Sequence, residues 1–354
     1  MFRQSNGYSF KIDENIFFSQ MKNNWVSLNY NSIGSNGSSS NFSLQNSLLG
    51  SIGEAFERQA LTAVYDNVDL FSNINCIDLI DYNVKQIPLN NDTFKYFSDT
   101  TGLATHLTSK KSIYNSVSEF IERQSFVISY LSKKGRFRIE KDKWLYSIIK
   151  DEFKFLQFYD ISISKSFYTV IAIGERKKGY IDLGLGTGRS VTEAIKNVLR
   201  EIFPFRGKHG EIDIGDNEKV DYIHLYNKLS IEQIKAAYDY LNKLPIKSIQ
   251  EYPVVETIEM QQIILELYKV YNIRPLLCSL NHLKQEYSRN SYSKITKVFA
   301  YGWFPSLNPN DYTDDIYKNV EKNTGFLLDK KVNFLPFQWF LQQDIPVCFL
   351  LEVY

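Results

Sequence analysis

Three segments of the chain combine closely spaced acidic residues with the apolar pattern of a buried helix face. The acids are Glu54 and Glu57 in SIGEAFERQA, and Glu119 and Glu122 in NSVSEFIERQ. The third segment, AIKNVLREIF, contains Glu201. Carboxylates three residues apart project from the same side of a helix. If the three helices pack together with these sides facing inward, they gather five carboxylates in one place.

Such a cluster needs cations, because two carboxylates about 4 Å apart repel each other by roughly 4 kcal/mol at an effective dielectric near 20. A single Glu-Arg pair most often lies on a solvated helix face, and that alternative predicts no function. Apolar neighbours favour burial in the first two segments: Leu48, Leu49, Ile52, Ala55 and Phe56, then Ile113, Val117, Phe120 and Ile121. Buried carboxylates need partners, and a hard cation such as Mg²⁺, which usually brings phosphate groups, is the expected one.

Composition and charge exclude several other classes of function. Of the 354 residues, 44% are hydrophobic and 23% are charged, which are globular values. The net charge of +1 attracts neither nucleic acid nor an anionic membrane. No apolar run approaches the ~20 residues of a membrane span, and the first residues lack the apolar core of a signal peptide. We therefore expect a cytoplasmic protein that binds no nucleic acid and no membrane.

The three cysteines and four histidines are dispersed along the chain, and their spacing predicts neither a zinc site nor a Cys-His nucleophilic pair. A triplet of glycines, Gly184, Gly186 and Gly188, superficially suggests a dinucleotide-binding loop. Its G-x-G-x-G spacing is wrong for that fingerprint, and the strands before it look antiparallel, so we reject dinucleotide binding.

Strands and helices alternate along the chain without an obvious linker, which predicts one α/β domain of mixed sheets, packed helices and internal repeats over residues 1–354. We expect a hairpin at 166–175 and 180–185, helices at 230–244 and 257–271, strands at 273–280 and 294–302, and a packed apolar tail at 333–354. The Gly/Ser-rich segment 34–43 predicts a flexible surface loop, or else a loop whose N–H groups approach a phosphate.

At the three acidic helices the sequence resembles the YcaO superfamily of ATP-dependent amide-activating enzymes. Members carry an S-x-x-E-x-x-E-R helix, which SIGEAFER at 51–58 matches fully. Their second helix, N/S-x-x-x-E-x-x-E/x-R, is matched by NSVSEFIER at 115–123. In the third, Q-x-x-x-E-x-x-Q, Glu201 keeps its place, while Asn197 and Pro204 replace the two glutamines.

The resemblance covers residues 34–340 and implies a single YcaO-like domain around an ATP and Mg²⁺ site. It implies that the metal ions are held by Glu54, Glu57, Glu119, Glu122 and Glu201. Nucleotide binding is implied for Ser51, Glu54, Asn115, Glu119, Asn197, Glu201 and Arg189. Catalytic roles are implied for Glu57, Glu122, Arg58 and Arg123, where the planar guanidinium groups suit phosphate oxygens.

The implied activity is that of a cyclodehydratase subunit in the synthesis of ribosomal peptide natural products such as bacteriocins. It would convert Cys, Ser or Thr of a precursor peptide to thiazoline or oxazoline. The implied assembly is a hetero-oligomer with a separate leader-binding protein of the ubiquitin-activating type, and a flavin-dependent oxidase could act on the azoline afterwards. Two alternatives stay open: thioamide formation, and a non-catalytic subunit that binds nucleotide or only scaffolds, which Pro204 would favour.

Overall fold

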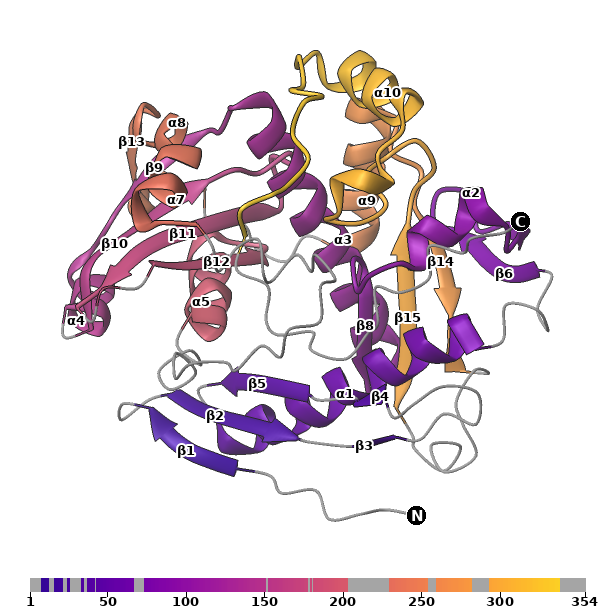
Figure 1. Ribbon diagram of the computed structural model, residues 1–354, viewed down its shortest axis with the longest axis horizontal. Coiled ribbons are helices and arrows are strands. Elements are labelled where there is room, and N and C mark those ends of the chain that lie inside the picture. Colours follow the sequence, from indigo (N-terminus) through magenta and orange to yellow (C-terminus); the bar gives the residue numbers. More distant parts are fainter. Residues whose placement is uncertain are drawn as a thin grey trace.

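Two five-stranded sheets contain most of the strands in the described residues (Figure 1). The computed structural model describes residues 8–12, 16–21, 24–25, 33–34, 37–41, 43–66, 73–150, 152–177, 179, 181–202, 229–253, 259–281 and 293–337. The first sheet is antiparallel and has the order β7 (Val84–Pro88), β6 (Asn73–Asp78), β14 (Leu276–Ser279), β15 (Lys294–Phe299), β8 (Leu103–His106).

The second sheet is mixed, because its last strand runs parallel to its neighbour while the other pairs are antiparallel. Its order is β12 (Ile181–Gly188), β11 (Tyr168–Arg176), β10 (Phe153–Asp160), β9 (Phe137–Glu140), β13 (Ile246–Ser248). A smaller sheet contains β1 (Tyr8–Ile12), β2 (Ile16–Met21) and β5 (Gly37–Asn41), and β3 (Asn24–Trp25) pairs with β4 (Ile33–Gly34).

The described helices pack on and between these sheets. They are α1 (Leu44–Asp66), α2 (Asn91–Phe94), α3 (Ser109–Ser132), α4 (Lys143–Ile149), α5 (Val191–Ile202), α7 (Ile231–Ala237), α8 (Asp239–Asn242), α9 (Met260–Tyr271) and α10 (Asp314–Thr324). Short 3₁₀ turns occupy Lys95–Phe97, Ile249–Glu251 and Pro309–Asp311.

Helix α3 joins the two large sheets. It contacts β8 and β15 of the first sheet and β11 and β12 of the second, and Figure 1 shows it between them. Phe120, Ile121 and Phe126 on α3 are almost completely buried and belong to the same apolar core as Leu185 of β12 and Val298 of β15. Helix α3 therefore links the two large sheets.

Helices α1 and α5 each cover one of the edge strands that flank α3. Helix α1 contacts β8 and also β2 and β5 of the small sheet, while α5 contacts β12 and β11. The glycines of β12 explain how closely α5 can approach: a Cβ on Gly186 would lie 2.5 Å from the carbonyl oxygen of Ala194, and one on Gly184 would lie 2.6 Å from Ile202. The glycine triplet thus lets α5 pack closely on β12.

Several predicted elements are confirmed. The hairpin is present as β11 and β12, whose antiparallel register runs from Tyr168 opposite Gly188 to Glu175 opposite Ile181. Helix α9 and strands β14 and β15 lie within their predicted segments. The helix predicted at 230–244 is divided into α7 and α8 at Tyr238, a buried residue whose hydroxyl group donates to the Pro336 carbonyl at 2.7 Å.

One expectation needs correction, and one pairing was not predicted. Residues 37–41 form strand β5 rather than a loop, because their backbone pairs with β2 and Ser47 of α1 hydrogen-bonds the Ser39 carbonyl at 2.8 Å. Cys76 on β6 and Cys278 on β14 lie opposite each other in the first sheet and form a disulfide. They are 202 residues apart in the sequence, so only the pairing of the two strands brings them together.

The C-terminal segment is described as far as Phe337, which is buried together with Leu335. Residues 338–354 of the predicted apolar tail lie outside the described residues. Among the described residues, none of the helices combines the length and the apolar run that a membrane crossing requires. The domain bounds 1–354 and 34–340 stay predictions.

Candidate active site

The five predicted carboxylates meet where the edge strands β8 and β12 face α3. Each large sheet ends on one of these strands. Glu57 interacts electrostatically with Glu54 and Glu119, and Glu201 does so with Glu122 and Glu54. Helices α1, α3 and α5 therefore bring together acids that are up to 147 residues apart in the sequence (positions 54 and 201).

Helix α3 is fixed on the first sheet by two small polar side chains. Ser112 Oγ hydrogen-bonds the Ala104 carbonyl of β8 at 3.0 Å, and Ser116 Oγ donates to the Thr296 carbonyl of β15 at 2.9 Å. Ser112, Ser116, Glu119 and Arg123 follow one another at spacings of four, three and four residues, which places them along one side of the helix. The serines let the helix approach the sheet, and the next turns carry the charges to the strand edges.

Glu57 and Glu201 each bind the backbone of an edge strand. Glu57 Oε1 accepts the Thr105 N–H of β8 at 2.5 Å, and Glu201 Oε2 accepts the Leu185 N–H of β12 at 2.9 Å. Burial raises the pKa of Glu57 to about 8, with a further contribution from the charge of Glu54. Burial also raises the pKa of Glu201 to about 8, with Glu122 adding to it. Both groups consequently hold a proton at neutral pH when no cation is near.

Arg123 lies among the remaining acids. Its Nη2 is 3.7 Å from Glu119 Oε1, and its Nε is 4.0 Å from Glu122 Oε1. Burial raises the pKa of Glu119 well above its usual range and also raises the pKa of Glu122, although Arg123 opposes both shifts. For Arg123 itself burial lowers the pKa, but the surrounding acids, including Glu201, outweigh burial and hold it above its ordinary value. One arginine thus shares its charge among several carboxylates.

On α1 the second predicted arginine is bound to an acid of its own helix. Arg58 Nη2 is 2.6 Å from Glu54 Oε1, and the arginine side chain is 6% exposed against 25% for the glutamate. Ser51, one turn earlier, is buried and donates to the Leu48 carbonyl at 2.9 Å. Helix α1 therefore brings a partly exposed carboxylate and a buried guanidinium group to the cluster together.

The other predicted nucleotide ligands differ in their surroundings. Asn115 is exposed near the start of α3. The side-chain amide of Asn197 donates to the Thr187 carbonyl at 2.7 Å and accepts from Arg200 at 2.8 Å, so it links α5 to β12. Arg189 places its guanidinium group 4.8 Å from the ring centre of Tyr114. Their nucleotide roles stay predictions, and Pro204 lies outside the described residues.

The sequence analysis missed a third cation beside the cluster, in addition to Arg58 and Arg123. Lys297 of β15 is completely buried, and its Nζ donates to the carbonyls of Asp99 at 2.9 Å and Thr101 at 2.7 Å. Burial lowers the pKa of Lys297 to about 8, although Asp99 and Glu119 oppose this shift. A lysine within the apolar strand pattern ITKVFAYG was the available signal.

The chemistry of these donors fits a hard cation. All five acids offer oxygen atoms, and the described cations close to them, Arg58, Arg123 and Lys297, are fewer than the carboxylates. Within the described part of the chain, no three acidic, histidine or cysteine side chains already stand in a metal-enclosing arrangement. That agrees with the contacts above, since the carboxylates turn to arginines and strand N–H groups.

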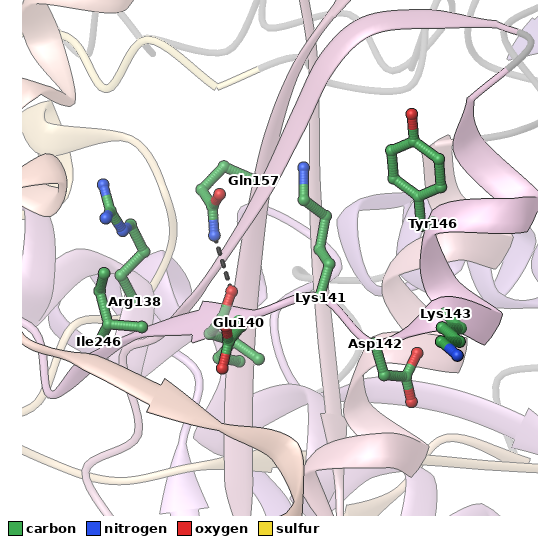
Figure 2. A pocket seen from close by; sticks show the side chains of 9 residues that line it. Arg138, Glu140, Lys141, Asp142, Lys143, Tyr146, Gln157 and Ile246 are labelled. Carbon is green, nitrogen blue, oxygen red and sulfur yellow. Dashed lines mark hydrogen bonds between the residues drawn. The ribbon is translucent and has the colours of Figure 1, made fainter.

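A separate cavity of about 610 Å³ contains none of the predicted site residues (Figure 2). It lies along β9, the start of α4 and β13, and its lining residues are Arg138, Ile139, Glu140, Lys141, Asp142, Lys143, Tyr146, Gln157 and Ile246. Gln157 Nε2 donates to the Ile139 carbonyl at 2.8 Å, and Lys141 Nζ donates to the Leu156 carbonyl at 3.0 Å. Two of its polar groups are therefore already used in holding the sheet together.

Comparison with known families and structures identifies the fold. The family model described as YcaO cyclodehydratase, ATP- and Mg²⁺-binding, matches residues 74–250, half of the chain. This range includes α3 and α5 but not α1, so Glu54 and Glu57 are assigned to the site by their sequence motif and by the contacts in the structure. A search of curated proteins found no match.

Solved structures of low sequence identity share the fold. The E. coli microcin synthetase McbBCD complex contains a similar chain with a TM-score of 0.66 and 18% identity, covering 94% of this chain and 96% of that one. YcaO from Methanopyrus kandleri, bound with AMPPCP and Mg²⁺, gives 0.62 and 13%, covering 84% and 85%. A heterocyclase in complex with substrate and cofactor gives 0.67 and 14%, covering 94% and 54%.

Proposed function

The chain belongs to the YcaO family of ATP- and Mg²⁺-binding cyclodehydratases, and we propose that it converts Cys, Ser or Thr residues of a precursor peptide to thiazolines or oxazolines. The observation that carries this proposal is the meeting of five carboxylates at two strand edges, with the pKa of Glu57 and of Glu201 raised to about 8. Such a cluster is strained when empty and is relieved by divalent cations, which in turn hold the phosphates of ATP.

The predicted ligands divide between two tasks. The five carboxylates, Glu54, Glu57, Glu119, Glu122 and Glu201, would hold Mg²⁺ directly or through water. The bound Mg²⁺ ions would supply positive charge that offsets the charge of the phosphate oxygens. Arg58 and Arg123, now paired with Glu54 and Glu119, would bind the phosphate oxygens, for which their guanidinium groups are suited.

The reaction requires positioning rather than an enzyme nucleophile. The thiol or hydroxyl of the peptide gives up its proton to solvent as it attacks the preceding carbonyl carbon, and the former amide oxygen takes the γ-phosphoryl group of ATP. That oxygen leaves as phosphate while the amide nitrogen gives up its proton and forms the ring double bond, so the products are azoline, ADP and phosphate. The arginines would spread the charge that develops during phosphoryl transfer. Because the peptide supplies the nucleophile, the reaction needs no Cys-His pair on the enzyme.

We further propose that the chain acts in a hetero-oligomer with a leader-binding protein. The similar McbBCD chain was solved within a complex, and a second structure of that complex has pro-MccB17 bound. A flavin-dependent oxidase acting on the azoline would be a third component. Reconstitution with and without the partner tests this assembly: full activity of the isolated chain on a leader-bearing peptide would contradict it.

Mass spectrometry of the reconstituted reaction separates the possible functions. Cyclodehydration removes about 18 Da for each ring and releases ADP, because phosphoryl transfer to the amide oxygen leaves the nucleotide as ADP. A gain of about 16 Da with a sulfur donor would instead identify thioamide formation, in which no adjacent side chain supplies the nucleophile. An unchanged peptide mass in an intact complex that binds ATP would identify a non-catalytic subunit.

A further inference from the structure

A buried ion network of Arg176, Glu152 and Asp182 lies at the C-terminal end of α5. None of these three residues belongs to the five-carboxylate cluster. Arg176, the last residue of β11, has its Nη1 2.9 Å from Glu152 Oε2, and its Nε donates to Asp182 of β12. The three side chains are 6%, 6% and 0% exposed. The guanidinium group also lies 4.9 Å from the ring centre of Phe153, so two carboxylates and one aromatic ring surround this arginine.

The remaining donor of Arg176 connects this network to the third acidic helix. Its Nη2 donates to the Ile202 carbonyl at 2.7 Å. Ile202 is the last residue of α5 and directly follows Glu201. The final carbonyls of a helix have no partner within the helix, and a cation is favourable there. Arg176 therefore binds the helix end at the residue next to a predicted metal ligand.

Glu201 is tied to the same strand as the network. Its Oε2 accepts the Leu185 N–H of β12, while Asp182, three residues earlier on β12, binds Arg176. The last turn of α5 is thus attached to β12 by the Glu201 carboxylate and, through Ile202, by Arg176. A shift at Ile202 would change the direction from which the Glu201 carboxylate enters the cluster.

Stability alone does not account for two buried acids around one arginine. Replacing a buried ion pair with apolar side chains of similar volume is often neutral or stabilising, whereas the fork of an arginine fixes directions that a lysine cannot reproduce. The Asp182 Oδ1 atom has no hydrogen-bond partner within the described residues, and burial raises the pKa of Asp182 to about 6. The network is costly in free energy but geometrically specific.

We propose that Arg176 is a positioning residue, which, held by Asp182 and Glu152, fixes the end of α5 so that Glu201 faces the Mg²⁺ and ATP site. This inference rests on the proposed function, because it concerns the same site. Its ligand is Mg²⁺ with a nucleoside triphosphate, and the guanidinium group of Arg176 donates to Asp182, Glu152 and the Ile202 carbonyl. Outer residues that orient metal ligands typically contribute about 10–100-fold to metal affinity.

The test compares Arg176→Lys with a matched control, Arg274→Lys, using the full chain and titrating AMPPCP in the presence of Mg²⁺ by calorimetry. Arg274 also binds two acids, Asp78 and Asp81, but beside β6 of the first sheet, and its side chain is 39% exposed. We expect affinity to fall about tenfold or more in Arg176→Lys and to stay at the wild-type value in Arg274→Lys. Wild-type affinity in a folded Arg176→Lys protein would overturn the inference.

A double-mutant cycle distinguishes positioning from general destabilisation. If Arg176 acts through Glu201, Arg176→Lys causes no further loss in a Glu201→Gln background, whereas independent effects would add. Asp182→Asn, which keeps the side-chain volume, is the second variant should Arg176→Lys not fold, and we expect it to weaken binding in the same direction. Failure of the wild-type chain to bind Mg²⁺ with AMPPCP would instead contradict the proposed function itself.

Discussion

At the edge of β8, Glu57 accepts a strand N–H at 2.5 Å, and at the edge of β12, Glu201 accepts one at 2.9 Å. In both places burial raises the pKa of the carboxyl group to about 8. The helices that supply these acids differ, however. Helix α1 also brings Glu54 and Arg58 to the cluster, whereas on α5 the amide of Asn197 is used to hold the helix on β12.

The packing beneath the two helices differs as well. On the β12 side α5 lies so close to the strand that a Cβ on Gly186 would meet the Ala194 carbonyl oxygen at 2.5 Å. On the β8 side a Cβ on Gly53 of α1 would lie 3.8 Å from Thr105, which is ordinary contact. The β8 edge therefore carries more of the charged groups, and the β12 edge depends on close packing and on the Arg176 network.

The largest effect is expected from removing charge at the cluster. We expect Glu122→Gln and Glu57→Gln to lower ATP turnover by about 10²–10³-fold while the fold is retained, because both groups act on the charge that develops during phosphoryl transfer. Phosphate release in the presence of precursor and partner measures this, with circular dichroism as the check of folding. If Glu201→Gln retains nearly full turnover, the two edges are not equivalent and the β8 edge alone supplies the metal ligands.

The two glycines test the packing difference directly. Gly186→Ala should destabilise the protein by about 1–3 kcal/mol, because backbone atoms of α5 must move. Gly53→Ala is its matched control and should be neutral or stabilise by up to about 1 kcal/mol, since alanine favours a helix and there is space for the methyl group. Urea unfolding measures both changes, and equal destabilisation by the two variants would contradict the comparison.

In the absence of Mg²⁺, the free energy of unfolding should fall as the pH rises from about 5 to about 8. In the unfolded chain Glu57 and Glu201 lose their protons near the ordinary carboxyl pKa, but in the folded chain they keep them until the pKa of about 8 is passed. The folded state binds more protons in this range, so raising the pH favours unfolding. Urea midpoints across the range measure the effect, and Glu57→Gln should flatten the profile. Saturating Mg²⁺ with AMPPCP should abolish the decline, and a profile indifferent to both would count against the strained cluster.

The smallest expected effect concerns Asn197 on the β12 side. Asn197→Ala removes the hydrogen bonds to the Thr187 carbonyl and to Arg200, which should cost about 1 kcal/mol of stability. Asn115→Ala, at an exposed position of α3, should leave stability within about 0.5 kcal/mol. Thermal unfolding of the two variants provides the comparison. A larger loss of nucleotide affinity in Asn115→Ala than in Asn197→Ala would assign nucleotide contact to α3 and a structural role to Asn197.

The amino-acid sequence alone was enough to predict that three helices, at 51–58, 115–123 and around Glu201, bring acidic residues together. The spacing of Glu54 and Glu57, and of Glu119 and Glu122, is a local property. Side chains three positions apart on a helix always lie on the same side. The β11–β12 hairpin and helix α9 were predictable for the same reason, because their patterns of apolar residues are complete within short segments. The motif spacing also carried the resemblance to the YcaO family.

Only the tertiary structure decided how the cluster is held. That Glu57 and Glu201 bind strand N–H groups depends on β8 and β12 being edge strands, and strand order is a property of the whole sheet. Lys297 and the Arg176 network depend on contacts between segments distant in sequence or on burial that no local pattern specifies. Residues 37–41 became a strand for the same physical reason: a Gly/Ser segment has little preference of its own, so pairing with β2 and packing against α1 determined its conformation.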